Sequence, residues 1–318
     1  MTGVVTLGET MALLALPAGR IGAGAPVVVG IGGAESNVAI ALARLDVPCT
    51  WISRLGDDAL GTLVGREIRA EGVTVLAKRS ADAPTGMMVK EHVGGRPSRV
   101  RYYRRGSAAS FLSPDDVDES VIAAADVLHV TGITAALGPG PRAAVVRAIE
   151  VARASGTLVS FDVNHRSTLW DEAEAVPVLA GLIATADLVF AGTDEAALVL
   201  GRPCPDPVTP GTGAALAEAL AALGPATAVV KLGELGSVAH QGAESVSAPT
   251  RPVRVVDPVG AGDAFVGGYL AELLRDGSLA RCLAVGNSLG GFVCTVAGDW
   301  EGLPTRAELD ATAGEVVR

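Results

Sequence analysis

Aromatic residues, cysteines and lysines are scarce in this chain, and each scarcity excludes something. Aromatic residues make up 3% of the 318 residues, so Ala, Val, Leu and Gly must fill most of the core. The four cysteines lack the paired spacing of zinc sites and redox motifs, which indicates buried thiols in a reducing, cytoplasmic compartment. No apolar run is long enough for a membrane span, and no basic segment precedes an apolar core at the N-terminus.

Basic charge is also in short supply. The formal net charge is −10 at pH 7, which makes nucleic acids and anionic membranes poor partners. The lysines are Lys78, Lys90 and Lys231, and all other basic side chains are arginines or histidines. An anion that binds this acidic protein must be met by local donors, so clustered arginines are informative.

Short apolar runs alternate with helical stretches from about residue 51 to residue 283. This alternation predicts an α/β fold with a doubly wound, mostly parallel sheet. The expected strands are Val4–Leu7, Ala12–Leu16, Thr50–Ser53, Val127–Val130, Leu158–Phe161, Leu188–Phe190 and Ala228–Leu232. The expected helices are Ser36–Leu45, with Ser36 as candidate cap, Pro141–Ser155, Glu172–Thr185 and Ala214–Leu223.

Two segments interrupt the alternation. Residues 13–30 are rich in glycine and proline with extended apolar pieces, and residues 85–107 have the features of a hairpin. In that hairpin, Met87–Val93 and Ser98–Arg104 flank a turn at Gly94 and Gly95. We expect the two segments to form a small second sheet attached to one domain that spans residues 1–318.

The most informative stretch runs from Val255 to Phe265. Two residues of strand type, Val255 and Val256, lead into Gly260-Ala261-Gly262, and an apolar helical run follows Asp263. Glycines let successive backbone N–H groups converge, and a helix start adds unpaired donors, so an anion site is predicted. A carboxylate beside such a site is suited to accept a proton from a substrate hydroxyl. Alternatively, the stretch is an ordinary turn in which Asp263 caps the helix.

Two further glycine clusters carry polar residues. In the first, Gly30 to Asn37, Asn37 is placed to bind a polyhydroxy ligand, or else to cap a helix that follows a tight turn. In the second, Lys231 to Gly236, the loop is suited to cover nucleotide phosphates, although a hairpin turn explains it equally well. A P-loop is excluded because no Gly-Lys pair exists, and no complete Gly-x-Gly-x-x-Gly supports a dinucleotide-binding dehydrogenase.

Three stretches of the chain together resemble the signatures of a known family. Residues 32–37 (Gly-Gly-Ala-Glu-Ser-Asn) and 54–61 (Arg-Leu-Gly-Asp-Asp-Ala-Leu-Gly) resemble the N-terminal signature of the PfkB, or ribokinase-like, sugar kinases. Residues 257–263 (Asp-Pro-Val-Gly-Ala-Gly-Asp) resemble their C-terminal signature. The signatures lie in the expected order, and the resemblance covers essentially the whole chain. It implies a Rossmann-like α/β domain with a small β-sheet lid that transfers the ATP γ-phosphoryl group to a sugar hydroxyl.

The resemblance also implies roles for individual residues. Asp263 matches the catalytic base, and Gly260, Ala261 and Gly262 match the anion hole that faces the transferred phosphoryl group. The residues that match nucleotide contacts are Asn164, Thr193, Lys231, Gly233, Gly236 and Asn287. We expect helix-end donors to keep Asp263 ionised.

The magnesium region departs from the family pattern. The family often carries Asn-x-x-Glu there, whereas this chain has Gly192-Thr193-Asp194-Glu195, with the glutamate kept and the asparagine absent. Mg²⁺ held by ATP phosphates and water is still expected, and no residue of this chain is assigned as its direct ligand. Whether a monovalent cation assists near the Asp257 turn stays open.

An arginine-rich run suggests the substrate. As a strand, residues 99–105 place Val100, Tyr102 and Arg104 on one face, a mixture suited to a small organic anion. A solvated basic edge strand is the alternative. Arg166 follows the strand that ends near Phe161 and offers a second cation to the substrate. Alternatively, it caps the next helix or pairs with Asp171.

Three stretches resemble the members of the family that phosphorylate 2-keto-3-deoxygluconate. They are the Tyr-Tyr-Arg run at residues 102–104, the stretch Asp-x-Asn-x-Arg-x-x-Leu-Trp at residues 162–170, and Gly-Asp-Trp-Glu-Gly at residues 298–302. That resemblance implies substrate contacts by Gly33, Tyr102, Arg104, Arg166 and Asp299, and we expect Asn37 to join them as a ligand of the sugar hydroxyls. Where the lid of the family often has another aromatic residue, this chain has Met88. The predicted reaction is phosphorylation of the terminal hydroxyl of this keto-deoxy sugar acid.

Three other functions stay open from the sequence. The first is a related kinase for 5-dehydro-2-deoxygluconate, fructose or ribose. The second is a non-catalytic sugar or nucleotide sensor on the same fold, and the third is a nicotinamide-dependent dehydrogenase, which lacks its glycine fingerprint. Exposed lid edges and the family resemblance favour a homo-oligomer.

Overall fold

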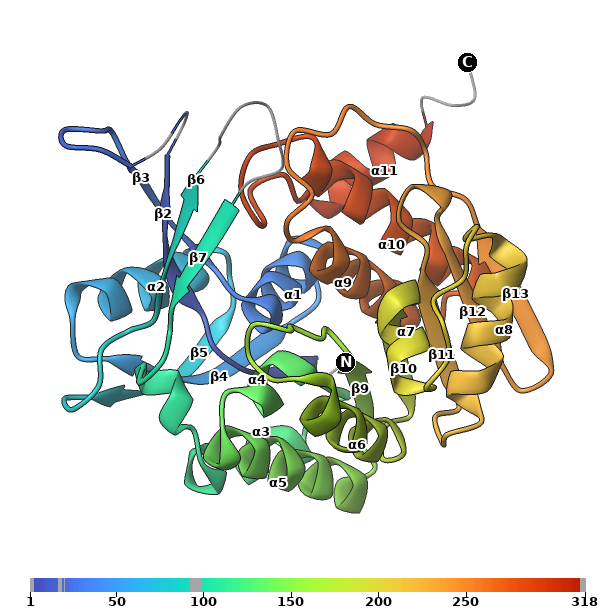
Figure 1. Ribbon diagram of the computed structural model, residues 1–318, viewed down its shortest axis with the longest axis horizontal. Helices are drawn as coiled ribbons and strands as arrows, with labels where there is room; N and C mark the ends of the chain where they lie inside the picture. Colours follow the sequence, from blue (N-terminus) through green and yellow to red (C-terminus); the bar gives the residue numbers. More distant parts are fainter. Residues whose placement is uncertain (1–2, 17–18, 20, 92–98, 315–318) are drawn as a thin grey trace.

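A nine-stranded sheet forms the centre of the molecule (Figure 1). The computed structural model describes residues 3–16, 19, 21–91 and 99–314. The strands lie in the order β13-β12-β11-β10-β9-β8-β1-β4-β5, and those from β11 to β5 are parallel. The bounds are β1 Val4–Leu7, β4 Cys49–Gly56, β5 Thr74–Ser80, β8 Val127–Thr131, β9 Leu158–Asp162, β10 Leu188–Gly192, β11 Thr227–Lys231, β12 Ser237–Gln241 and β13 Glu244–Ala248. The hairpin β12–β13 adds an antiparallel edge.

Helices cover both faces of this sheet because successive strand residues point to opposite sides. In β1, Val5 and Leu7 pack into one apolar cluster, and Val4 packs into the other. The first face carries α3 Glu119–Ala123, α4 Gly132–Ala136, α5 Pro139–Ser155, α6 Glu172–Ile183, α7 Thr193–Val199 and α8 Pro210–Ala221. The second carries α1 Ala34–Arg44, α2 Ala59–Ala70, α9 Ala261–Leu273, α10 Leu279–Cys294 and α11 Arg306–Gly314. The predicted doubly wound α/β fold is therefore confirmed.

The order of the strands positions a crevice. Strand β1 pairs with β4 on one side and with β8 on the other, with Val4 opposite both Cys49 and Val127. The chain therefore winds outward in both directions from β1. In open α/β sheets, ligands bind outside the carboxyl ends of the strands where the winding direction changes.

A second, four-stranded sheet stands beside this crevice, at the left of Figure 1, and is called the lid below. Its strands are β2 Met11–Ala15, β3 Val28–Gly32, β6 Met87–Glu91 and β7 Arg99–Tyr103, in the order β3-β2-β6-β7. Neighbours are antiparallel except β2 and β6, which are parallel. The second sheet expected from residues 13–30 and 85–107 is confirmed, while its predicted turn at residues 94–95 lies outside the described residues.

Two local expectations were wrong. Helix α1 is preceded by Gly33 as its N-cap, so Ser36 lies inside the first turn and bonds back to the Gly33 carbonyl. Val255 and Val256 form no strand and are 59% and 54% exposed, because this segment runs outside the sheet. Its backbone is instead fixed by N–H groups of Val256 and Asp257 that donate to the Cys294 carbonyl at the end of α10.

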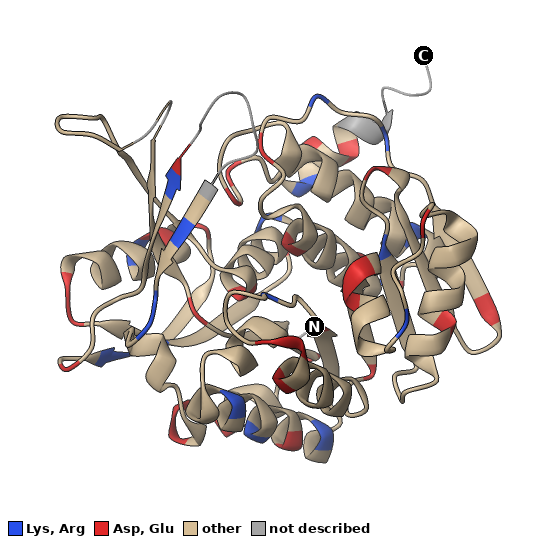
Figure 2. Cartoon of the chain, in the orientation of Figure 1, with Lys and Arg blue, Asp and Glu red and all other residues tan. Residues whose placement is uncertain are grey.

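Charged residues are spread over the surface (Figure 2). The lid strands β6 and β7 carry basic residues, whereas the first turn of α7 is acidic. Among the described residues, no helix combines the length and the apolar character that crossing a membrane requires.

Candidate active site

A cleft of about 630 Å³ lies between the lid and the carboxyl edge of the large sheet. Its walls come from the lid, from the loops after β1, β9, β10 and β11, and from the start of α9. The opening is at the point where the winding direction of the sheet changes, which is where the topology predicts a ligand site.

The start of α9 builds an anion site in this cleft. Gly260 is the N-cap residue with φ +80°, in the left-handed region, and a Cβ there would collide with the Asp299 carbonyl oxygen. The glycine therefore permits both the turn and the close approach of the two chain segments. Among the described residues, a Cβ at Gly262 would meet the Lys231 ammonium alone, at 3.5 Å, so a cation stands beside the N-terminus of α9.

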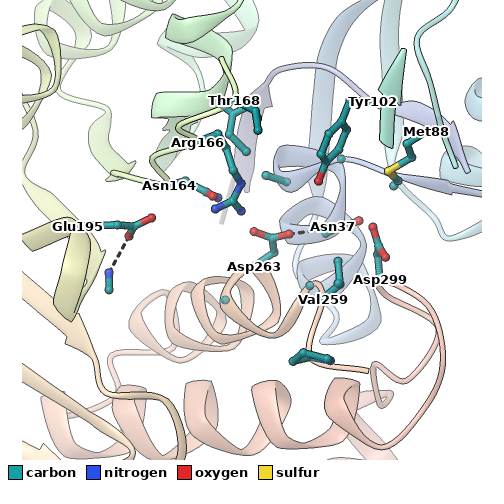
Figure 3. Close-up of a pocket in the computed structure, with 18 of the residues that line it drawn as sticks. Asn37, Met88, Tyr102, Asn164, Arg166, Thr168, Glu195, Val259, Asp263 and Asp299 are labelled. Carbon is teal, nitrogen blue, oxygen red and sulfur yellow. Dashed lines mark hydrogen bonds between the residues drawn. The ribbon is translucent and has the colours of Figure 1, made fainter. Parts of the chain in front are cut away.

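Asp263 lies in the first turn of α9 and points into the cleft (Figure 3). Its Oδ2 accepts a hydrogen bond of 2.8 Å from Nδ2 of Asn37 in α1. Neither residue acts as a helix cap, since the N-caps of α9 and α1 are Gly260 and Gly33. The two capping alternatives are thereby excluded.

The protonation of Asp263 differs from the expectation. Burial raises the pKa of its carboxyl group to about 7, and the charge of Asp162 adds to this rise. The hydrogen bond from Asn37 and the charges of Arg166 and Lys231 act in the opposite direction. The helix-end donors therefore do not keep the group firmly ionised. A pKa near neutral pH suits a general base, which must accept a proton and release it again.

The guanidinium of Arg166 points toward Asp263 from the loop after β9 (Figure 3). Its side chain is exposed, and among the described residues it forms no ion pair. Asp171, the alternative partner, instead caps α6 by accepting from the Glu174 N–H. Arg166 thus offers a cation to a ligand in the cleft.

The lid side of the cleft holds Tyr102 and Arg104. Strand β7 ends at Tyr103, so Arg104 lies just beyond it and the strand expected over residues 99–105 is shorter than predicted. Arg104 is 9% exposed and already paired, because Nε and a terminal nitrogen both lie 2.6 Å from Oε2 of Glu9. Ser107 donates to the other Glu9 oxygen at 2.5 Å. Arg104 also lies over the Tyr102 ring, with its Cζ 5.8 Å from the ring centroid.

The opposite side of the cleft holds the residues expected to bind the nucleotide. Lys231 Nζ lies 2.7 Å from Asp162 Oδ2, and Asp162 Oδ1 is buried with no hydrogen-bond partner among the described residues. Glu195 accepts from the Gly192 N–H at 2.7 Å and the His165 N–H at 2.9 Å. Burial raises the pKa of Glu195, while the charge of Lys231 opposes the rise.

Most of the predicted site residues line this one cleft. They are Gly33, Asn37, Tyr102, Arg104, Asn164, Arg166, Thr193, Lys231, Gly233, Gly260, Gly262, Asp263 and Asp299. Ala261, Gly236 and Asn287 are not part of its lining. Asn287 Nδ2 donates to the Ala248 carbonyl, and Gly236 ends the β11–β12 hairpin loop, so the turn interpretation of residues 231–236 holds alongside a place at the cleft.

Sequence reasoning missed three charged residues at or near the cleft. Glu9 pairs with Arg104, Asp162 pairs with Lys231, and Lys90 is buried between Asp257 and Asp299. Glu9 and Asp162 each follow or end a buried strand at the carboxyl edge, which was a usable signal. The signal for Lys90 was weaker: the chain has few lysines, and this one lies in a strand of the lid.

Comparisons with known proteins agree on one family. The model of the pfkB family of carbohydrate kinases matches residues 1–306. The 2-dehydro-3-deoxygluconokinase of Bacillus subtilis is 35% identical over 96% of this chain and 93% of its own length. The crystal structure of a 2-dehydro-3-deoxygluconokinase from Thermotoga maritima superimposes with a TM-score of 0.90, at 26% identity and 98% coverage of both chains. An aminoimidazole riboside kinase from Salmonella enterica, solved with its riboside and an ATP analogue, reaches a TM-score of 0.79 at 26% identity, covering 97% of this chain and 98% of its own.

Proposed function

The chain belongs to the pfkB family of carbohydrate kinases, and from this membership we propose that it transfers the γ-phosphoryl group of ATP to the terminal hydroxyl of 2-dehydro-3-deoxygluconate. One observation carries the chemistry: Asp263 stands in the cleft beside the open N-terminus of α9 with a pKa of about 7. The relatives named as 2-dehydro-3-deoxygluconokinases support the choice of sugar acid.

In the proposed reaction, Asp263 accepts the proton of the substrate hydroxyl as its oxygen bonds to the γ-phosphorus. The bond between that phosphorus and the oxygen of the departing ADP breaks. The N–H groups at the start of α9, with Gly260 to Gly262 as anion hole, face the charge on the transferred group. Arg166 and Lys231 lie close enough to influence Asp263 and add positive charge on either side of it.

Recognition of the sugar acid rests on Arg166 and the lid. Because Arg104 is already neutralised by Glu9, its role is to hold the Tyr102 ring and to donate hydrogen bonds, rather than to supply a free cation. Arg166 has no carboxylate partner among the described residues, so it is the side chain suited to bind the substrate carboxylate. Gly33, Asn37 and Asp299 are proposed to contact the sugar hydroxyls.

The nucleotide is proposed to lie along the Lys231 side, with Asn164, Thr193, Gly233, Gly236 and Asn287 as further contacts. Asp162 and Glu195 fit a magnesium ion, because Asp162 Oδ1 is buried with no hydrogen-bond partner in the part of the chain that the structure describes, and Glu195 lies close enough to interact with Asp162. Asp162 and Glu195 would hold the water shell of such an ion, which would supply positive charge to offset that of the ATP phosphates. A side chain at position 192 would require the Asp194 carboxylate to move aside, since a Cβ on Gly192 would lie 2.7 Å from its Oδ1.

Self-association and a cytoplasmic location are proposed as well. Edge strand β3 leaves Val28 and Val29 58% and 51% exposed, and an unpaired apolar edge is suited to meet a second copy. Sedimentation velocity of the wild type and a Val29→Lys variant tests this. A monomer in both samples contradicts it.

A substrate panel tests the proposed activity. ADP release is measured with 2-dehydro-3-deoxygluconate, 5-dehydro-2-deoxygluconate, fructose and ribose, with Mg²⁺ and ATP present. We expect the highest kcat/KM for 2-dehydro-3-deoxygluconate. A higher kcat/KM for another sugar would show that this other sugar is the substrate. Binding of a sugar without turnover of any of them would identify a sensor instead.

A further inference from the structure

A buried charge cluster lies behind the cleft, where the lid meets the large sheet. Lys90, in lid strand β6, is 1% exposed. Its Nζ lies 2.5 Å from Oδ2 of Asp257 and 3.0 Å from Oδ1 of Asp299, and these carboxylates are 0% and 5% exposed. One ammonium group from the lid therefore bridges two acids from separate loops of the main body.

The electrostatics make the lysine necessary to this arrangement. Burial alone lowers the pKa of Lys90, but the charges of Asp299 and Asp257 outweigh it and leave the pKa above its ordinary value. Burial raises the pKa of Asp299, and Lys90 opposes that rise. Two buried carboxylates with no cation between them would repel each other, so one must take up a proton or the loops must move apart.

Both acids lead directly to the catalytic cleft. Asp257 Oδ1 accepts from the Val259 N–H at 3.3 Å, in the segment that runs into the anion hole at Gly260. The Asp299 carbonyl oxygen packs against Gly260 Cα, and its carboxylate lies against Gly32 in the sugar side of the cleft. Figure 3 shows Asp299 and Val259 on the same wall as Asp263.

We propose that Lys90 is a positioning residue that fixes the lid to the phosphate loop, residues 257–262, and orients Asp299 toward the sugar. In this arrangement a sugar that orders the lid also orders the anion hole, since the two are joined through one buried ammonium group. The effect on turnover rests on the proposed kinase function. The mechanical coupling between lid and loop does not.

The first experiment measures the coupling without turnover. Hydrogen–deuterium exchange is followed in peptides that cover β6 and residues 257–263, in the wild type and in Lys90→Met, which removes the charge and keeps the length. We expect both peptides to exchange about tenfold faster in the variant, because both lose the same anchor. Lys78→Met is the matched control, since Lys78 is a lysine at the surface that pairs with Asp116, and neither residue lines the cleft.

If Lys90→Met does not fold, Asp257→Asn tests the same coupling from the other side. It should speed exchange in β6, which is far from residue 257 in the sequence. Faster exchange at the substituted segment alone, with the other segment unchanged, overturns the proposal for either variant.

The second experiment uses turnover of whichever sugar the wild type accepts in the panel. We expect Lys90→Met to lower kcat about tenfold or more and to raise KM for the sugar, with the ATP KM within about twofold of the wild type. The double variant Lys90→Met/Asp257→Asn removes one acid with the lysine and should regain thermal stability without regaining kcat. Recovery of both indicates that Lys90 only balances charge, and overturns the positioning role. A wild type that accepts no sugar refutes the proposed function and leaves the exchange result to decide this inference.

Discussion

Replacing Asp263 by Asn should abolish most of the activity and at the same time stabilise the fold. The substitution removes the proposed base but keeps the size of the side chain and an oxygen that can accept from Asn37. Loss of a general base typically costs about a hundred- to ten-thousandfold in rate. We therefore expect kcat to fall by at least about a hundredfold, with the KM for ATP little changed.

The gain in stability follows from the pKa of Asp263. Burial raises it from the ordinary value of 3.8 to about 7, so between these pH values the folded protein holds a proton that the unfolded chain has released. The free energy of unfolding of the wild type therefore falls as pH rises through this window. A pKa difference of about three units between the folded and unfolded states lowers the free energy of unfolding by about 4 kcal/mol at most, and partial solvent access reduces this effect to about 2 kcal/mol.

Urea unfolding at about pH 8 and about pH 5.5, combined with ADP-release kinetics, checks both halves of this prediction. Asp263→Asn should be more stable than the wild type at the higher pH, and its advantage should shrink by about half at the lower pH, because the wild-type carboxyl is then largely protonated when folded. A variant that keeps turnover within about tenfold of the wild type would refute the role of Asp263 as base. A stability difference that does not change with pH would refute the raised pKa.

Three further substitutions test the site. Asn37→Ala removes a hydrogen bond that lowers the pKa of Asp263, so the acid limb of the kcat/KM profile, expected near pH 7, should move to higher pH; a shift to lower pH contradicts the assignment. Gly260→Ala should lower the free energy of unfolding by about 2 kcal/mol or more, because φ is +80° and the new Cβ collides with a backbone carbonyl. The control variant Gly262→Ala should unfold like the wild type. Equal urea midpoints for the two variants would show that the close approach at Gly260 does not exist. Arg166→Met should raise KM for the sugar acid about tenfold or more and change KM for fructose far less, in the same coupled assay; equal changes argue against a carboxylate contact.

The sequence predicted the elements whose cause is local. Alternating apolar runs and helical periods located the strands from β8 to β11 and the helices between them, since each pattern reflects burial within a single segment. The anion loop was also predictable from the sequence, because the residue that precedes the helix has a positive φ, which favours glycine at position 260. The strand expected at Val255 failed since two β-branched residues indicate extended backbone but not a neighbouring strand to pair with.

Only the tertiary structure decided the state of the charged groups. Asn37 meets Asp263 across 226 positions of sequence, Arg104 meets Glu9 across 95, and Lys90 meets Asp299 across 209. Each partner was visible as a residue type, but the pairing depends on the strand order and on where the lid stands over the crevice. Burial then set the pKa of Asp263 near neutral pH, and Glu9 neutralised Arg104, which the sequence had suggested as a binding residue for a small organic anion. The chain pattern thus determined which chemical groups the protein carries, whereas the distances between them, which fix charge and reactivity, arose only from the fold.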